Sequence, residues 1–208
     1  MVKRGGVRIL LGTVLILSAL ILTVYNVGTE YRAGISAEDT LNELMLASGS
    51  AMGEEFAYPD YLLNPSMEMP VKRIGEFDYI GVLELPDLGL SLPVISEWNY
   101  AGLKKAPCRY SGSAYLDNMV ICAHNYRTHF GGIKNLSAGN SVVFTDIDGN
   151  VFTYQVTDIE ILRPYASEEM VSGDWDLTLF TCTVGGARRV TVRCCRVNND
   201  PLWAFSMP

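Results

Sequence analysis

Residues 177–192 read LTLFTCTVGGARRVTV, which is the pattern of two β-strands joined by a turn. Val, Thr, Leu and Phe favour a pleated, half-buried strand, and Gly185 and Gly186 are typical of a tight turn. Cys182 stands at the end of the first strand, beside the turn, where a thiol is exposed enough to react. A free cysteine is more often a buried packing residue, so the role of Cys182 depends on the rest of the chain.

The two arginines at the start of the second strand are expected to face in different directions. Side chains alternate along a strand, so Arg189 falls on the face opposite to the apolar residues Val190, Val192 and Cys194. If those residues fill a core, Arg189 points toward the substrate and Cys182, where its charge favours a thiolate or stabilises an oxyanion. Arg188 and Arg193 are predicted to be solvated arginines.

Only two histidines are available as a base for Cys182. His124 ends the apolar run at residues 119–123, and a lone histidine in such a place is usually structural. However, a thiol with a pKa of about 8.5 is mostly protonated at neutral pH, and a nearby imidazole makes it reactive. His124 is therefore the candidate base, whereas His129 is predicted to lie on a surface loop.

Residues 9–27 form an apolar run without a charged residue, long enough to cross a hydrocarbon core of about 30 Å as a helix. Lys3, Arg4 and Arg8 precede the run, which by the positive-inside rule keeps residues 1–8 in the cytoplasm. A cleaved signal peptide is the alternative, but the run is longer than an ordinary signal segment and no clear small-x-small cleavage site follows. We expect a retained transmembrane anchor with the rest of the chain outside.

Residues 28–75 are predicted to form a stalk. A short helix is expected to begin with Ser36 as its N-cap, with Asp39 in place of the usual capping-box glutamate, and to end near Ser48. Residues 49–69 are rich in Gly, Pro, Asn, Tyr and Ser, which is typical of a linker with patches of contact.

Short strands punctuated by turns are predicted through most of residues 76–208. They are expected at residues 80–85, 91–95, 118–123, 141–144, 151–156, 159–162, 177–181 and 190–194. The sequence DIDGN at 146–150 is typical of a hairpin turn, and only brief helical stretches, such as one at 167–173, separate the strands. The pattern predicts a mainly β domain, an antiparallel barrel or sandwich.

Beyond the anchor the chain is acidic. The first 27 residues carry three basic residues and no acidic one, so the remainder holds 13 Lys and Arg against 23 Asp and Glu. This balance argues against the binding of nucleic acid or anionic lipid. The five cysteines have no zinc-ligand spacing, and the scattered carboxylates define no metal site.

An odd number of cysteines leaves at least one thiol unpaired. Cys122 is expected to be buried in its apolar run. Cys194 and Cys195 are adjacent on a predicted strand, so their side chains point to opposite faces and a bond between them would be strained.

Several motifs together resemble the sortase family. The sequence TLFTC at 178–182 is similar to the family's TLxTC strand end, and Arg189 heads the following apolar strand as the family arginine does. The sequence NMVICAHN at 118–125 is similar to the family's histidine strand, with Ala123 where glycine is usual. The resemblance runs in order over roughly residues 78–197. In this alignment Cys108 stands where many members have glycine, and a free loop thiol is expected there.

The resemblance implies a closed eight-stranded β-barrel and a cysteine transpeptidase. Cys182 would attack the Thr–Gly bond of an LPxTG-like C-terminal sorting signal, His124 would protonate the leaving amine, and Arg189 would hold the substrate or the oxyanion. The neighbouring residues expected to contact substrate are Ala123, Asn125, Thr181 and Thr183. The implied partners are proteins with a sorting signal and an amine from a cell-wall peptidoglycan precursor or a pilin lysine. No cofactor or metal is implied, and calcium dependence is left open.

The subclass is predicted from what the sequence lacks. No DPW or DPF lid segment precedes the barrel and no second apolar run follows it, which favours wall anchoring of the class A, D or E type over the pilus-polymerising class C. The alternatives are a hydrolytic cysteine peptidase on the same scaffold, a pilin-linking sortase, and a non-catalytic anchored barrel that binds a partner.

Overall fold

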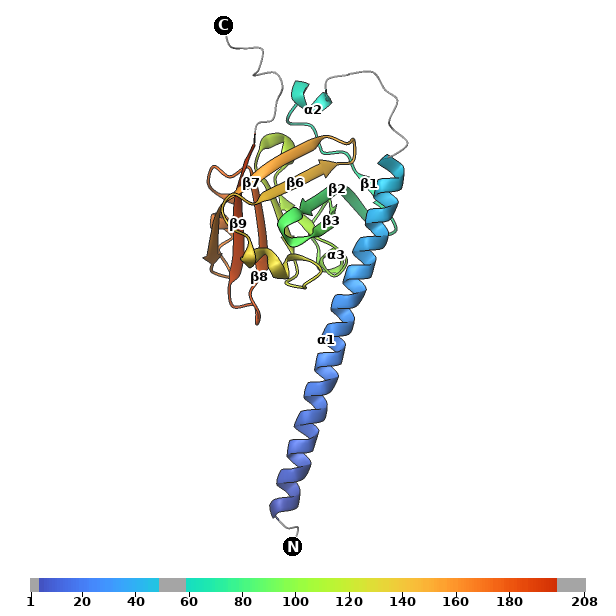
Figure 1. Ribbon diagram of the computed structural model, residues 1–208, viewed down its shortest axis with the longest axis vertical. Helices are drawn as coiled ribbons and strands as arrows, with labels where there is room; N and C mark the ends of the chain where they lie inside the picture. Colours follow the sequence, from blue (N-terminus) through green and yellow to red (C-terminus); the bar gives the residue numbers. More distant parts are fainter. Residues whose placement is uncertain (1–3, 49–58, 198–208) are drawn as a thin grey trace.

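The structure is a computed structural model that describes residues 4–48 and 59–197. The predicted linker therefore lies partly outside the described residues, as do residues 198–208 of the predicted barrel domain and residues 1–3 of the predicted cytoplasmic segment. One long helix carries a β-barrel against its C-terminal half, and its N-terminal half extends away from the barrel (Figure 1).

In the described part of the chain, nine strands form one sheet. They are β1 (Lys72–Ile74), β2 (Phe77–Leu85), β3 (Leu90–Ile95), β4 (Cys108–Ser111), β5 (Met119–Ala123), β6 (Ser141–Asp146), β7 (Val151–Leu162), β8 (Leu177–Cys182) and β9 (Arg189–Arg196). The helices are α1 (Arg4–Ser48), α2 (Asp60–Leu63), α3 (Tyr100–Leu103) and α4 (Ser167–Val171), with 3₁₀ turns η1 (Pro86–Leu88), η2 (Ala114–Leu116) and η3 (Phe130–Asn135).

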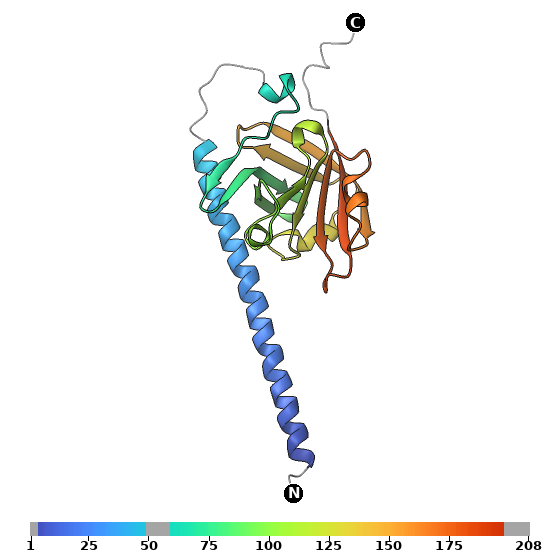
Figure 2. The same ribbon diagram turned by 180° about the vertical axis from the view of Figure 1, so that it is seen from behind.

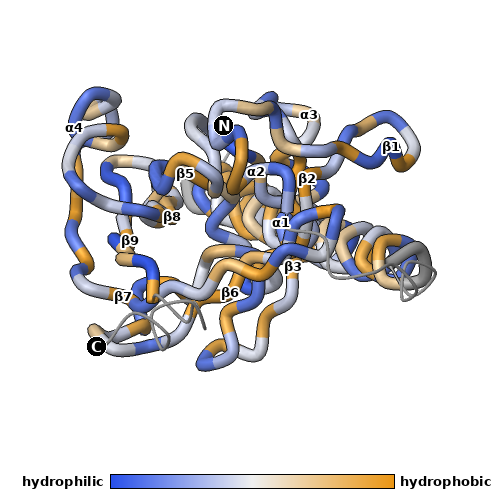
Figure 3. Tube along the Cα trace, turned by 90° about the horizontal axis from the view of Figure 1, so that it is seen from above, coloured by the Kyte–Doolittle hydropathy of each residue, from blue (hydrophilic) through white to orange (hydrophobic). Residues whose placement is uncertain are grey.

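The sheet closes into the predicted eight-stranded barrel. Its order is β2-β3-β4-β5-β8-β9-β7-β6, and β6 pairs back with β2, while β1 adds a short hairpin to the start of β2. The neighbours are antiparallel except for β3 with β4 and β5 with β8, which are parallel. Seen from above, β1 and α4 lie on opposite sides of the barrel (Figure 3).

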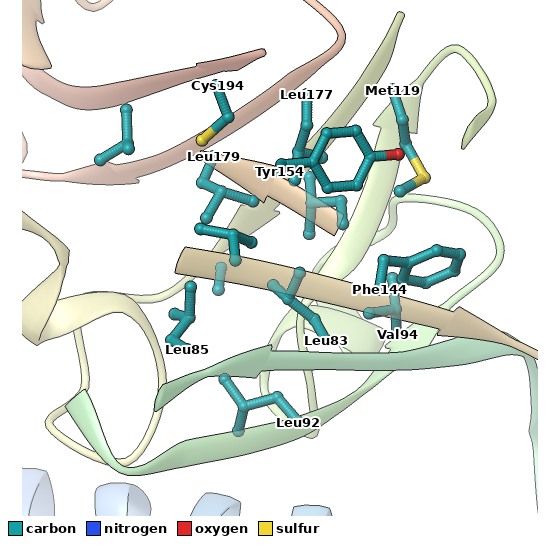
Figure 4. Packing of buried hydrophobic residues seen from close by; sticks show 14 of the residues in the cluster. Leu83, Leu85, Leu92, Val94, Met119, Phe144, Tyr154, Leu177, Leu179 and Cys194 are labelled. Carbon is teal, nitrogen blue, oxygen red and sulfur yellow. The ribbon is translucent and has the colours of Figure 1, made fainter. Parts of the chain in front are cut away.

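The barrel interior is filled by the alternate, inward-facing residues of its strands. Leu83, Val94, Phe144, Leu179 and Cys194 come from five different strands and meet in one cluster (Figure 4). Phe144 and Tyr154 are among the largest fully buried side chains. Burial of such side chains contributes roughly 1.5–3 kcal/mol each and is the main source of barrel stability.

Two strand predictions were wrong, although the number eight was right for the barrel. The strands expected at 151–156 and 159–162 are one continuous strand, β7, with an irregularity in its pairing to β9 between Val156 and Asp158. Strand β4 was not predicted, and it places Cys108 in a fully buried strand position and not in a loop. The irregularity between Val156 and Asp158 interrupts the hydrophobic alternation of β7 without ending the strand.

The separate stalk helix was also wrong. Ser36 is not an N-cap but lies inside α1, which continues without a break through the apolar run and on to Ser48. No proline occurs between residues 4 and 48, so no residue there is barred from an α-helix. The helix contains an apolar segment long enough to cross a membrane, and none of that segment is buried in the structure.

The C-terminal half of α1 packs on the barrel through a stripe of small and apolar residues. Ala33, Ala37, Thr40 and Leu44 are buried, and their spacing of three or four residues places them on one helix face. Gly34 allows a close approach, because a Cβ there would lie 2.9 Å from Cγ2 of Thr128. The predicted stalk is therefore part of the folded body along this stripe.

Residues just before β1 also belong to the barrel. Tyr61 of α2 stacks on Tyr115 with ring centroids 4.6 Å apart, and Met69 is buried. These contacts pack the segment before β1 against the barrel core.

Closure of the barrel predicts a strong effect of a side chain at Gly81. This residue has φ of +154° and faces β6, and a Cβ there would lie 2.1 Å from the carbonyl oxygen of Thr145. We expect Gly81→Ala to lower the free energy of unfolding by roughly 2–4 kcal/mol, measured by denaturant titration of the full chain in detergent. Gly132→Ala is the control, because its Cβ would meet only Leu88 at 3.6 Å. Equal losses in the two variants would mean that the close approach of Gly81 to β6 does not limit stability.

Candidate active site

The parallel pair β5 and β8 brings two distant residues to one edge of the barrel. Ala123 at the end of β5 is the direct neighbour of Thr181 in β8, so His124 and Cys182 leave adjacent strands side by side. The buried Thr181 hydroxyl donates a hydrogen bond of 2.8 Å to the Ala123 carbonyl. Parallel strands end at the same edge, which is why residues 58 positions apart meet here.

Strand β9 starts at the same edge and adds the arginine. Arg189 is the cross-strand neighbour of Cys182, and its guanidinium donates to the carbonyl of Gly186 at 3.1 Å. Arg188 is exposed on the turn and does not line the cavity described next. The two arginines are thus separated, as the sequence predicts, but the reason is that Arg189 opens β9 whereas Arg188 lies in the exposed turn before it.

Cys182, His124 and Arg189 line one cavity of about 320 Å³, here called the Cys182 cavity. Its wall is largely aromatic and apolar and comes from several segments: Trp98, Tyr100, Leu103, Tyr110, Met170 and Phe180. Tyr110 meets Phe180 edge to face at 5.4 Å. This wall was not predicted from the sequence, although the cluster of aromatic residues near position 100 was a signal for it. A mostly apolar cavity with a few convergent polar groups is typical of a ligand site.

The α4 side of the cavity is held by a buried arginine. Arg193 is 3% exposed and pairs through Nε with Glu160 at 2.7 Å. Its other nitrogens donate to the carbonyls of Glu169 at 2.6 Å and Met170 at 2.8 Å, and to the Thr178 hydroxyl at 3.0 Å. The prediction of a solvated Arg193 was wrong because α4 covers that face of the barrel. Arg193 therefore fixes the segment that carries Met170 into the cavity.

The surroundings of His124 favour a neutral imidazole. Burial lowers the pKa of His124 below its ordinary value, and the positive charge of Lys104 lowers it further. The ring lies against Tyr126, with centroids 4.9 Å apart. A neutral imidazole at neutral pH can accept a proton from a thiol, which suits a general base.

The five cysteines are all free, and burial separates them. Burial raises the pKa of Cys108 and of Cys194 to about 12, and it raises the pKa of Cys122 as well. These thiols stay protonated and inert. Cys182 is half-buried and opens into a cavity with an imidazole and a guanidinium, so it is the thiol with the surroundings of a nucleophile.

The four predicted substrate-contact residues divide into two pairs. Ala123 and Thr181 line the Cys182 cavity. Asn125 lines a neighbouring cavity beside α1, and Thr183 is bonded across the β8–β9 turn, where its hydroxyl accepts from the Arg188 N–H at 3.1 Å. Within the described ranges, no three His, Cys, Asp or Glu side chains are grouped so that they could hold a metal ion.

His129 was predicted to lie on the surface, but it is 0% exposed. It lies in the segment that α1 covers, next to the Ala33 backbone, and neither ring nitrogen makes a well-formed hydrogen bond to a described residue. Burial, and secondly the charge of His124, lowers the pKa of His129 to about 4. His129 does lie in a turn, as predicted, but its predicted exposure was wrong because the helix that covers it is distant in sequence.

A family model of the sortase domain matches residues 83–197, more than half of the 208-residue chain. No curated protein matches by sequence. Among solved structures, a lid mutant of sortase A from Corynebacterium diphtheriae has a TM-score of 0.55 and 21% identity, covering 79% of this chain and 95% of that one. Sortase C from Clostridium perfringens SM101 has a TM-score of 0.51 and 24% identity, covering 77% of this chain and 90% of that one. A sortase D5 transpeptidase from Clostridium perfringens has a TM-score of 0.55 and 17% identity, covering 82% of this chain and 99% of that one. At these identities the structures establish the fold, and they span classes A, C and D.

The buried His129 predicts a loss of stability in acid. Its folded pKa of about 4 lies below the unfolded value of about 6.5, so the unfolded state binds more protons between these values and stability falls as pH falls through them. From about pH 7.5 to about pH 4.5 the parent should lose roughly 2–3 kcal/mol more than His129→Phe, which fills the site but takes no proton. Denaturant titrations at the two pH values measure this, and parallel losses in both proteins would contradict it.

Proposed function

This chain belongs to the sortase family of cysteine transpeptidases, and on that premise we propose that it cleaves an LPxTG-like sorting signal through a thioester on Cys182. The observation that carries the proposal is the convergence of Cys182, His124 and Arg189 around one cavity at one barrel edge. The three groups are a nucleophile, a base and a positive charge, which acyl transfer requires.

In the first step the sulfur of Cys182 attacks the carbonyl carbon of the Thr–Gly bond. The S–C bond forms and the C–N bond breaks, and the proton given up by the thiol reaches the departing amine through His124. Arg189 would stabilise the developing oxyanion, and its cross-strand pairing with Cys182 supports this role.

In the second step an acceptor amine attacks the thioester carbonyl. The C–N bond forms, the S–C bond breaks, and His124 moves the proton of the amine back to the sulfur, so the enzyme is restored. Water in place of the amine would give hydrolysis, which is the peptidase alternative on the same residues.

The aromatic wall is proposed to seat the apolar side chain of the signal. Trp98, Tyr110 and Phe180 form a chain of edge-to-face rings, with centroid distances of 6.2 and 5.4 Å, and Met170 also lines the cavity. An extended peptide with one apolar side chain in this cavity would present its next carbonyl groups to the edge that carries Cys182. Ala123 and Thr181 are proposed as its backbone neighbours.

The proposed location is the outer face of a bacterial membrane. Residues 9–27 of α1 would span the bilayer once, with residues 1–8 in the cytoplasm, as the basic residues before the span favour. The proposed partners are then proteins that carry a sorting signal and an amine of a cell-wall precursor.

Wall anchoring is proposed for the class, with pilin linking as the second candidate. The second candidate is favoured by the class C structures among the neighbours, including a Streptococcus pneumoniae sortase C described for its pilin substrate specificity. Product analysis with a cell-wall peptide amine and with a lysine-containing pilin peptide distinguishes the two, since the preferred amine appears in the product.

One prediction of the proposed function concerns the covalent intermediate. Incubation with sorting-signal peptides should give a mass increase on the tryptic peptide that contains Cys182, equal to the acyl part of the substrate, because the thioester precedes aminolysis. Cys182→Ala should show no adduct and no cleavage, whereas Cys195→Ala, which removes the other half-buried thiol, should keep both. Cleavage by Cys182→Ala at the parent rate would refute the nucleophile.

The second prediction uses the adjacent arginines as a matched pair. Arg189→Ala should lower kcat by roughly 100- to 1,000-fold, the usual effect of removing one oxyanion donor. Arg188→Ala removes the same charge from the exposed turn and should change kcat by less than about threefold. Steady-state cleavage of a fluorogenic peptide measures both. Similar losses would mean that charge on the turn, and not the position of Arg189, is what matters.

A further inference from the structure

A second cavity, here called the helix-side cavity, lies between α1 and the barrel, next to the Cys182 cavity. Its volume is about 560 Å³, within the range of ligand sites. Its walls come from three places: α1 at Tyr25 to Arg32, the segment after α3 at Lys104 and Lys105, and the loop after His124 at Asn125 and Tyr126. Tyr126 also packs against His124, so this cavity is one aromatic ring away from the proposed base.

The charge of the helix-side cavity is positive although the chain as a whole is acidic. Arg32, Lys104 and Lys105 line it, against the single carboxylate of Glu30. The Glu30 Oε1 already accepts a hydrogen bond of 2.7 Å from the Arg127 N–H. None of the three cations forms an ion pair with another residue in the parts of the chain that the structure describes. Three unpaired cations around one cavity favour an anion.

The height of the cavity along α1 indicates which anion. Tyr25 lies near the end of the apolar run at residues 9–27, and Arg32 lies five residues beyond Val27, the last residue of that run. At about 1.5 Å per residue this is about 7.5 Å, close to the thickness of a headgroup layer, which is about 5–8 Å on each side of the hydrocarbon core. If residues 9–27 span a bilayer, the three cations therefore lie at the level of the lipid phosphates.

The orientation of the barrel agrees with this height. Both side views show α3 and the β8–β9 turn at the end of the barrel that faces the N-terminal half of α1 (Figures 1 and 2). Tyr100 in α3 is 74% exposed and Val184 in the turn is 91% exposed. Aromatic residues next to lysines are typical of a surface that contacts the membrane interface.

We propose that the helix-side cavity binds the phosphate of an anionic phospholipid in the outer leaflet and thereby docks the active-site end of the barrel on the membrane. This rests on the membrane-spanning orientation of α1 proposed above. The net negative charge of the chain argues against the binding of anionic lipid, but it is an average over the whole surface. The end of the barrel beside this cavity is locally basic. A phosphate beside Lys104 would also offset the charge that helps to lower the pKa of His124.

The test is amide hydrogen exchange of the full chain in nanodiscs. Phosphatidylglycerol mixed into phosphatidylcholine should slow exchange in residues 100–106 and 125–127 by about tenfold or more, as expected when two lysines contact an anionic surface. The β6–β7 turn at 146–150 serves as internal reference and should not change. No slowing by phosphatidylglycerol would overturn the proposal.

Variants assign the effect to the cavity. Lys104→Gln with Lys105→Gln should abolish the slowing, and Lys104→Arg with Lys105→Arg should restore it. Lys72→Gln with Arg73→Gln removes an adjacent cationic pair from β1, which does not line the cavity, and should leave the slowing intact. Slowing that persists in the Lys104–Lys105 glutamine variant, or is lost in the β1 control, would overturn the assignment.

A final arm separates the lipid from free anion. Inorganic phosphate added to phosphatidylcholine nanodiscs should not protect these residues; equal protection would mean a site for free phosphate and would overturn the lipid assignment. The exchange measurement needs no sorting-signal peptide. Failure of lipid docking and failure of the proposed transpeptidation are therefore read independently.

Discussion

The parallel pairing of β5 with β8 is the constraint on which the candidate site depends. It sets Ala123 beside Thr181 and so delivers His124 and Cys182 to one barrel edge. The buried hydrogen bond from Thr181 to the Ala123 carbonyl fixes the last step of that register, at the point where the strands end. Strand β9 then returns antiparallel and adds Arg189 opposite Cys182. Closure of β2 on β6 prevents the sheet from opening, so the edge keeps its shape.

The long helix is coupled to this edge. Glu30 accepts from the backbone of Arg127, Gly34 meets Thr128, and α1 covers the segment that carries His129. All three contacts fall on the loop that follows His124. A helix proposed to anchor the protein in a membrane thus also restrains the loop of the proposed base, which links the height of the barrel above the bilayer to the geometry of the site.

The sequence was sufficient where local alternation decides the outcome, and it failed where a distant segment does. Alternation read over residues 188–194 distinguished Arg189 from Arg188, although Arg188 lies in the turn before β9, and the strand ends at Ala123 and Cys182 were readable from the apolar runs. Arg193 and His129 were misassigned because α4 and α1 cover them, and neither contact leaves a mark in the neighbouring sequence. Ser36 looked like an N-cap because capping residues are also tolerated inside a long helix that packs on a neighbour. The aromatic wall was missed because its members meet only in the folded barrel.

The most direct test of this account is the rate of thioester formation on Cys182 in two variants of Thr181. Thr181→Ser keeps the hydroxyl that bonds the Ala123 carbonyl, whereas Thr181→Val keeps the shape of the side chain and removes that hydrogen bond. If the β5–β8 strand ends position the nucleophile and the base, the serine variant should acylate at close to the parent rate and the valine variant roughly 10- to 100-fold more slowly. Equal rates in a folded valine variant would show that the register at Thr181 does not control the site.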